Sequence, residues 1–309
     1  MKREPRFGVI TIQNVPCPTL LERWQYLEEF GFDSAWVADH FTNYREQAAE
    51  PWLECWTLLS ALAASTERIR VGTLVTNITF HNPAVLARQA LTVDHVSGGR
   101  LELGIGAGGA RSDHDKTGVP FWDPPERTAR LREFTEIVDH MLRNEKTTYR
   151  GRYYAVEDAD MSPPPVQRPR PPLTLAAWGP KSLRVAAENA DSWNFAPVRP
   201  ELTPEQNLQE TARRNEMLDD YCSELGRDPA EITRSLLLFP RASDTPFDSD
   251  EAFQDFVGRY REIGIDEFIL YWWREDAIEY GYEPTIIERS ADREMLGHLA
   301  TEVIPKLRA

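Results

Sequence analysis

A repeated order of helix, glycine and buried strand is the feature of this sequence that most limits its fold. In TLLERWQYLEEF the apolar residues lie close to helical spacing, Gly31 offers a left-handed stop, and SAWVA is typical of a buried strand. The same order recurs in REIGIDEFILYWW, where Gly264 is the stop, and in PAVLARQALTVDHVSGGRLELGIG. A fourth copy runs from KSLRVAAENA into DSWNFA. The pattern predicts alternating helices and strands.

Eight apolar runs are predicted as strands, and helical patterns fill nearly every gap between them. They are Phe7–Ile12, Ser34–Ala38, Ile69–Thr76, Leu101–Gly106, Leu173–Ala177, Ser192–Ala196, Thr233–Phe239 and Glu267–Tyr271. Strands that are apolar on both faces and joined by helices indicate a parallel sheet. Eight of them favour closure into a (β/α)8 TIM barrel, in the α/β class. The alternative is an open Rossmann-type sheet, but no GxGxxG opens a helix after the first strand.

We expect residues 1–309 to form one domain, because a barrel commonly uses about 250 residues and tolerates insertions. Residues 146–172 interrupt the pattern before the fifth strand and end in the proline-rich stretch PPPVQRPRPP. We interpret this segment as an irregular insertion, not as a linker between domains.

The composition excludes several classes of partner. A net charge of −15 repels phosphate backbones, so nucleic acid and anionic membrane are poor partners. No apolar run approaches the roughly 18 residues of a membrane span, and MKREPRFGVITI leads directly into a strand. Cys17, Cys55 and Cys222 are scattered and form no CxxC. We therefore expect a soluble, cytoplasmic protein with reduced thiols and no metal site.

Active sites of (β/α)8 barrels lie at the carboxyl ends of the strands, so the residues after each strand are the candidates. Asp39 and His40 follow the second strand and form the sharpest pair. A histidine titrates near neutrality and can exchange a proton as a hydride moves. The alternative is that Asp39 caps a loop and His40 is an ordinary polar residue.

Two further strand ends are candidates for binding a ligand. Glycines around Gly106, Ala107 and Gly108 let a backbone approach a flat ring or a phosphate, or simply allow a tight turn. In AAWGPKS, Gly179 precedes a helix that starts with proline, and the free N–H groups of such a helix bind anions, with Lys181 adding charge. An ordinary helix start is the alternative here.

Taken together, several stretches resemble the bacterial-luciferase-like family of flavin-dependent oxidoreductases. They are GFDSAWVADHF, ERIRVGTLVTNITFHNPAVLARQALTVDHVSGGRLELGIGAG, TGVPF with ERTARLREF, and PPLTLAAWGPKSLRVAAENADSW. The resemblance implies a (β/α)8 barrel with an insertion, a homodimer, and FMN or the deazaflavin F420 as cofactor. Asp39, His40 and Phe41 match the F420-using branch more closely.

Within that branch the resemblance implies specific roles. His40 lies beside the hydride-carrying carbon of F420, and Val75, Thr76 and Asn77 hold a cis peptide against the ring. The cofactor and its phosphate also meet the backbone of two stretches, which are Gly106, Ala107 and Gly108, and Ala177, Trp178, Gly179, Pro180 and Lys181.

Two positions depart from the sugar-phosphate dehydrogenases of that branch. Tyr44 stands where they carry Trp, and Gly109 stands where they carry a catalytic Glu. Asp113 or His114, in a pattern common to other members, is expected to supply polarity in place of that Glu.

The leading hypothesis is an F420-dependent oxidoreductase that transfers a hydride to or from a small organic substrate, with His40 handling the proton and Asp39 fixing its orientation. The first alternative is an FMN-dependent monooxygenase that uses reduced flavin and oxygen, and another is a flavin-binding protein without catalysis. A barrel glycosidase needs a pair of acids, and no convincing pair stands at strands four and seven.

Overall fold

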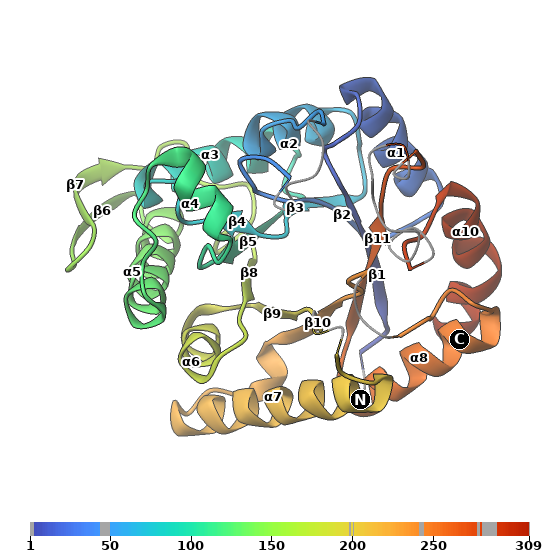
Figure 1. Cartoon of the computed structure of the whole chain (residues 1–309). Helices are drawn as coiled ribbons and strands as arrows, with labels where there is room; N and C mark the ends of the chain where they lie inside the picture. The colour runs from blue at the N-terminus through green and yellow to red at the C-terminus, as the bar shows by residue number, and fades with distance from the viewer. Residues whose placement is uncertain are drawn as a thin grey trace.

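Parallel strands joined by helices close into a barrel at the centre of the molecule (Figure 1). The computed structural model describes residues 3–43, 50–197, 199, 201–240, 244–276, 279 and 289–308. The barrel strands are β1 (Arg6–Thr11), β2 (Ser34–Val37), β3 (Arg70–Thr73) continued by β4 (Thr76–Asn77), β5 (Leu101–Gly106), β8 (Leu173–Ala176), β9 (Ser192–Phe195), β10 (Thr233–Leu237) and β11 (Glu267–Trp272). Pairing of β3 with β5 closes the ring, which confirms the predicted (β/α)8 barrel.

Helices surround the barrel on its outer side. They are α1 (Cys17–Glu29), α2 (Cys55–Ala64), α3 (Pro83–Val96), α4 (Arg111–Thr117), α5 (Pro124–Arg143), α6 (Pro180–Asn189), α7 (Pro204–Glu224), α8 (Asp250–Glu262), α10 (Arg293–His298) and α11 (Ile304–Arg308), with the short η1 (Pro229–Glu231) and η3 (Leu299–Val303). The glycine stops of the sequence pattern are confirmed, because Gly31 and Gly264 have φ values of 77° and 94°. Only glycine adopts such values without strain.

The barrel strands are largely apolar because both of their faces are buried. In β11, Phe268 and Leu270 pack outward against the helices, whereas Ile269 and Tyr271 fill the barrel interior with residues such as Ile10. Side chains alternate between the two faces of a strand, so a barrel strand favours apolar residues on both faces and not on one alone. This is the physical reason that the continuous apolar runs predicted strands correctly.

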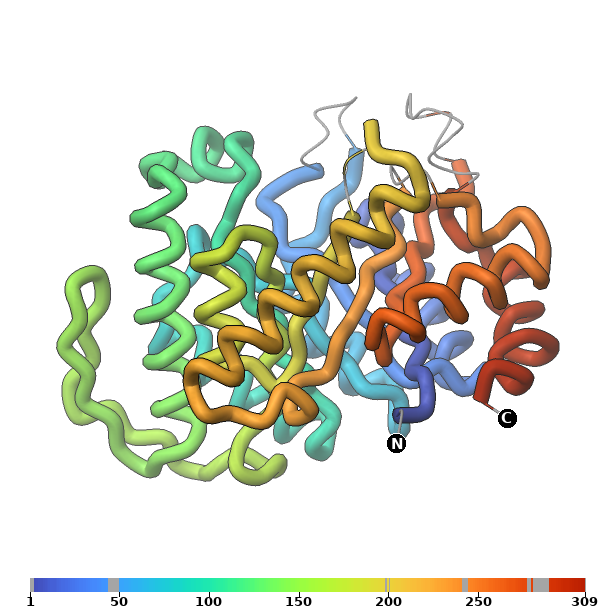
Figure 2. The backbone as a smooth tube through the Cα atoms, turned by 90° about the horizontal axis from the view of Figure 1, so that it is seen from below, coloured from blue at the N-terminus to red at the C-terminus, as the bar shows by residue number. Residues whose placement is uncertain are grey.

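The insertion before β8 is partly regular, which corrects the prediction of an irregular segment. Its first half forms an antiparallel hairpin of β6 (Lys146–Arg150) and β7 (Ala155–Asp160). Figure 2 shows this hairpin standing out beyond α5, away from the barrel. Most of its side chains are exposed, so the hairpin lacks the apolar pattern that marks the barrel strands.

Charged side chains fill the amino-terminal end of the barrel. The Arg6 Nη2 atom lies 2.8 Å from Glu102 Oε1 and 3.4 Å from Glu267 Oε1, and Arg70 Nε lies 2.5 Å from Glu102 Oε1. Burial raises the pKa of Glu267 to about 7, with Glu102 adding to the shift and Arg6 opposing it. The pKa of Glu102 is lowered instead, because Arg6 and Arg70 outweigh the effect of its burial.

The two ends of the described chain meet at this same end of the barrel. Arg308 of α11 donates from Nε to the carbonyl oxygen of Pro5 over 3.3 Å, and its Nη2 lies 2.5 Å from Asp33 Oδ2. Figure 2 places both termini on one side of the molecule. The carboxyl ends of the strands lie at the opposite end of the barrel.

Candidate active site

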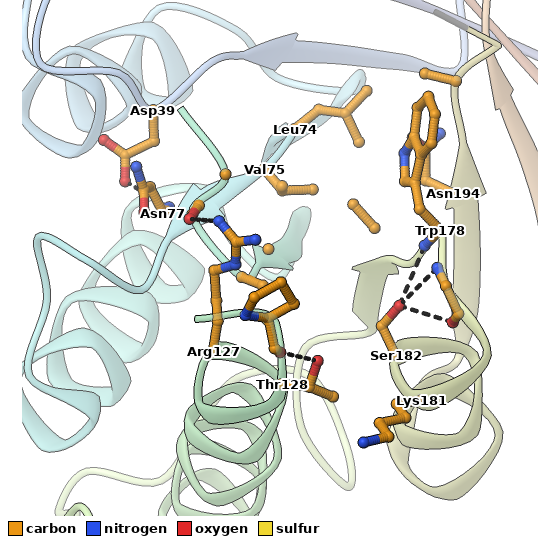
Figure 3. A pocket seen from close by; sticks show the side chains of 18 of the residues that line it. Asp39, Leu74, Val75, Asn77, Arg127, Thr128, Trp178, Lys181, Ser182 and Asn194 are labelled. Atoms are coloured by element: carbon orange, nitrogen blue, oxygen red, sulfur yellow. Dashed lines mark hydrogen bonds between the residues drawn. The ribbon is translucent and has the colours of Figure 1, made fainter. Parts of the chain in front are cut away.

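A cavity of about 760 Å³ opens at the carboxyl ends of the barrel strands (Figure 3). Its lining comes from the ends of β2, β4, β5, β8, β9 and β10 and from the first turns of α5 and α6. Strand ends and two helix starts therefore converge on one space, as expected for a barrel active site.

Asp39 is a buried acceptor at one end of the cavity. Its Oδ2 atom accepts from the backbone N–H of Asn77 over 2.9 Å and lies 2.8 Å from Nε2 of His81. Asp39 is only 4% exposed, yet it lines the cavity. Asp39 thus connects the end of β2 to the end of β4 and to the segment that follows β4.

His40 is paired with a different carboxylate. Its Nδ1 lies 2.8 Å from Oδ2 of Asp113, a residue of α4 that is 1% exposed. Asp113 also accepts from the side-chain amide of Asn77 over 3.1 Å and from the backbone N–H of Phe41 over 3.1 Å. Asn77 therefore connects the two carboxylates, through its backbone to Asp39 and through its side chain to Asp113.

This arrangement corrects the expectation that Asp39 orients His40. Asp113 is the carboxylate in contact with the His40 ring, and Asp39 is paired with His81. His81, which precedes the N-cap Asn82 of α3, is not among the predicted site residues. Because His81 is 42 residues from Asp39 in the sequence, no local pattern indicates their contact.

The end of β5 provides a close approach of backbone to the cavity. Gly108 has a φ of 71°, and a Cβ there would lie 2.3 Å from both Asn77 Oδ1 and Thr79 Oγ1. A Cβ on Gly106 would lie 2.4 Å from Val75 Cγ2. Packing therefore requires glycine at both positions, and both glycines also line the cavity. A cis peptide joins Leu74 and Val75, one residue earlier than the stretch that the resemblance indicated.

The start of α6 forms the opposite wall. The Ser182 hydroxyl accepts from the backbone N–H groups of Trp178 and Gly179 over 3.2 and 3.1 Å. First-turn amides have no acceptor within their own helix, and those after Pro180 belong to Lys181 and Ser182, which line the cavity. These amides and the Lys181 ammonium suit an anionic group.

Most predicted cofactor-binding residues line the cavity. They are Asp39, Val75, Asn77, Gly106, Ala107, Gly108, Trp178, Gly179, Pro180 and Lys181. His40, which is predicted to be catalytic, also lines the cavity. Thr76 and Ala177 are buried behind the wall instead, where Thr76 Oγ1 lies 2.8 Å from Thr73 Oγ1.

The remaining predicted catalytic residues differ in position. Asp113 is buried behind His40. His114 is 1% exposed, with Nδ1 lying 2.9 Å from the carbonyl oxygen of Pro120 and its ring edge-on to Phe121, so it belongs to the packing beneath the site. Tyr44 lies outside the described residues.

Other lining residues were not predicted as site residues. They are Leu74, Gly109, Pro124, Pro125, Arg127, Thr128, Ala176, Ser182, Asn194, Ala196 and Leu237. The residues at positions 124–128 belong to α5, the second helix after β5. They lie too far along the chain from the strand to be predicted from strand ends alone. The stretch ERTARLREF contributes to the family resemblance, which by itself indicates no role for its arginines.

Cys55 lies near Asp39, but its thiol is not suited to act as a nucleophile. Burial raises the pKa of its thiol well above the ordinary value, and the nearby Asp39 carboxylate raises it further. A thiol of this kind stays protonated and inert. Its place in the core cluster agrees with a packing role.

The chain belongs to the luciferase-like monooxygenase family, whose model matches residues 6–297. It is 34% identical over 220 residues to an F420-dependent glucose-6-phosphate dehydrogenase from Microbacterium testaceum, covering 69% of this chain and 61% of the relative. A second dehydrogenase of that description, from Amycolatopsis mediterranei, is 35% identical over 54% of this chain and 49% of the relative. The chain thus spans roughly half of the length of the curated relatives it matches.

Solved structures share the fold over nearly the whole chain. An F420-dependent tetrahydromethanopterin reductase from Methanopyrus kandleri matches with a TM-score of 0.77 at 19% identity, covering 99% of this chain and 100% of that one. A monooxygenase from Streptomyces bottropensis matches with a TM-score of 0.74 at 19% identity, covering 97% and 99%. At this identity the likeness concerns the fold. In the described part of the chain, no helix is long and apolar enough to cross a membrane.

Proposed function

We propose that this protein is an F420-dependent oxidoreductase that transfers a hydride between F420 and a small organic substrate. The observation that carries the proposal is the pair of His40 and Asp113 at one end of a cavity whose other end offers anion-binding amides. The name of the Microbacterium testaceum relative supports F420 as the cofactor.

The residues present fit a flat ring with a phosphate-bearing chain. Leu74, Val75, Trp178 and Leu237 give the cavity apolar walls, and the glycines at the end of β5 let backbone approach closely. At Gly179 a Cβ would meet nothing within 4 Å, so the start of α6 faces open space. We propose that Val75, Asn77 and residues 106–108 hold the ring and its chain, and that residues 178–182 hold the phosphate.

When bound, F420 supplies the carbon that accepts or donates the hydride. An alcohol that loses a hydride must also lose its hydroxyl proton, and His40 is a side chain at the cavity able to accept it. A carboxylate accepts hydrogen bonds, so Nδ1 donates to Asp113 and the exchanged proton belongs to Nε2. Asp113 therefore holds the imidazole in one tautomer, and Asn77 holds Asp113.

The proposal is tested by titrating the purified apoprotein with F420 and with FMN, followed by assays on small alcohols and activated alkenes. We expect F420 to bind and its absorbance to change with turnover. Tight binding of FMN without binding of F420 would refute the proposal. Oxygen uptake with reduced FMN would favour the monooxygenase alternative, and tight F420 binding without turnover would favour a protein that only binds the cofactor.

We further propose that the protein acts in the cytoplasm as a homodimer. Three free cysteines support a reducing compartment, and the family resemblance supports the dimer. Light scattering coupled to size exclusion is expected to give the mass of two chains, and a monomer at micromolar concentration would contradict the proposal.

A further inference from the structure

Asn194 is a buried amide on a part of the cavity wall whose neighbouring residues are apolar. It lies in β9 and is 3% exposed, and Figure 3 includes it among the side chains that line the cavity. The lining residues on the adjacent strands are Ala176 of β8 and Leu237 of β10. A side-chain amide carries two donor hydrogens and an acceptor oxygen, so a buried one needs several partners.

The fold supplies partners for only part of this amide. Nδ2 of Asn194 donates to Oγ of Ser235 on β10 over 3.0 Å. None of the described residues donates a hydrogen bond to Oδ1 of Asn194. A buried acceptor without a donor is unfavourable. The Asn194 carbonyl oxygen is therefore suited to a hydrogen-bond donor that a bound ligand brings into the cavity.

Ser235 connects this amide to the buried charges at the amino-terminal end of the barrel. It is the register partner of Asn194 on β9 and of Glu267 on β11, and none of the three residues is more than 3% exposed. Its hydroxyl also hydrogen-bonds with the Glu267 carboxyl and opposes the rise in the pKa of that group. A chain of side chains thus runs from Glu267 through Ser235 to the cavity wall.

The direction of the hydrogen bonds in this chain depends on whether Glu267 is ionised. A carboxylate only accepts, so Ser235 donates to it and accepts in turn from Asn194 Nδ2, which leaves Oδ1 for the cavity. A protonated carboxyl can donate to Ser235, whose single proton then turns toward Asn194. The amide would rotate to accept that proton, and its N–H groups would face the cavity instead.

Glu267 is placed to change its ionisation near neutral pH. Burial raises its pKa to about 7, the carboxylates of Glu102 and Asp33 add to the rise, and Arg6 opposes it. These charged groups belong to β5, to the segment before β2 and to β1, so they face the carboxyl from several sides. Both orientations of the Asn194 amide are therefore accessible near neutral pH.

We propose that Asn194 binds a hydrogen-bond donor of the ligand in the cavity, and that Ser235 and Glu267 are positioning residues that orient its amide. This inference rests on the proposed function. The donor has one of two sources, which are the imide N–H of the F420 ring and a hydroxyl or N–H group of the substrate. A ligand with such a donor favours the ionised form of Glu267, so by linkage its affinity increases as the pH rises through neutrality.

The first test uses fluorescence titration of the wild-type protein with F420 and with an F420 analogue methylated at the imide nitrogen. If the ring is the source, the analogue binds about tenfold more weakly than F420 to the wild type and equally well to Asn194→Leu. If the substrate is the source, F420 binds Asn194→Leu as it binds the wild type, and the KM of the substrate rises about tenfold with little change in kcat.

The second test is the pH dependence of that affinity between about pH 5.5 and about pH 8.5. His40 and the cofactor titrate in every variant, so the ratio of wild-type to Ser235→Ala affinity isolates the effect of the chain. We expect this ratio to rise about tenfold with pH. Glu267→Gln should remove the same pH dependence, because glutamine stays neutral.

A matched variant separates the chain from the general loss of a buried hydroxyl. Thr174 lies in β8, and its Oγ1 is buried and hydrogen-bonds with none of the described residues. Thr174→Val is expected to retain the wild-type pH dependence. Thermal melting checks that each variant folds, and the comparison of F420 with its methylated analogue in the wild type needs no variant.

The outcomes distinguish this inference from the proposed function. If the wild type binds F420, but Asn194→Leu changes neither the F420 affinity nor the KM and Ser235→Ala follows the wild type at every pH, the role of Asn194 is refuted and the proposed function stands. If the wild type binds F420 at no pH, both are refuted.

Discussion

The adjacent residues Asp39 and His40, at the end of β2, contact different partners. The side chain of Asp39 contacts His81 and the backbone of Asn77, whereas that of His40 contacts Asp113. Successive side chains along an extended backbone point to opposite sides, so neighbours in sequence rarely contact each other. The two residues therefore belong to two carboxylate–histidine pairs, which Asn77 connects.

Replacement of Asp113 tests whether it positions His40. In Asp113→Asn one amide oxygen would face donors that two carboxylate oxygens now accept, from His40 and Asn77 at Oδ2 and from the backbone of Phe41 at Oδ1, so an N–H group would meet a donor. The imidazole would lose its acceptor and its fixed tautomer, so we expect kcat to fall by about 100-fold while the Kd of F420 changes little. Stopped-flow absorbance and fluorescence titration measure the two quantities.

A conservative variant and a spectroscopic signal make that prediction specific. Asp113→Glu retains a carboxylate and is expected to keep more activity than Asp113→Asn. In NMR spectra of the wild type the Nδ1 proton of His40 is expected to be protected by its hydrogen bond, and it should disappear in Asp113→Asn. An unchanged kcat in a folded Asp113→Asn protein would contradict the positioning role.

The candidate site was predictable where it depends on strand ends and unpredictable where it depends on contacts between loops. Asp39, His40 and the start of α6 follow strands directly, so the barrel rule located them. The pairing of His40 with Asp113 spans 73 residues and that of Asp39 with His81 spans 42. Such pairings depend on how loops fold over the rim, which the periodicity of the strands does not determine.

At the scale of elements, the turn after β5 depends on Gly108. An alanine there would adopt an unfavourable φ of 71°, and its Cβ would overlap Asn77 Oδ1. We expect Gly108→Ala to lower the free energy of unfolding by about 1–3 kcal/mol and to displace Asn77. Urea denaturation measures the stability, and cofactor titration measures the effect on the site.

Gly258 provides the opposite case within a helix. It lies inside α8, and a Cβ there would meet nothing within 4 Å. Gly258→Ala is expected to raise the free energy of unfolding by about 0.5–1 kcal/mol, because alanine loses less backbone entropy in a helix. A loss of stability in this variant, or none in Gly108→Ala, would show that the two glycines do not differ as described.

The burial of the barrel strands and the exposure of the hairpin explain which elements could be predicted. Barrel strands and their helices repeat one apolar pattern, because each strand is buried on both faces. The hairpin of β6 and β7 follows a different rule, since it contacts α5 largely through polar groups, such as the Tyr149 hydroxyl with Glu136. Its polar, exposed strands resemble a loop in composition.

At the scale of the whole molecule, the buried charges at the amino-terminal end of the barrel make stability depend on pH. Burial raises the pKa of Glu267 from 4.5 to about 7, so the folded state holds a proton that the unfolded state releases. The free energy of unfolding should therefore fall as pH rises from about 4.5 to about 7, by on the order of 1–3 kcal/mol from this residue.

Glu267→Gln removes this dependence, because glutamine stays neutral. We expect the variant to be more stable than the wild type above pH 7 and similar to it at or below about pH 4.5, as measured by chemical denaturation at each pH. Glu102→Gln is the matched control and should be destabilising at pH 7, since Arg6 and Arg70 stabilise that carboxylate in its charged form. A stability of Glu267→Gln that follows the wild type at every pH would contradict the assignment.

The meeting of the chain ends at Pro5 and Arg308 has a practical consequence for working with this protein. Both ends lie at the end of the barrel opposite to the cavity. An affinity tag or a surface linker attached at either end would leave the cavity facing the bulk solution.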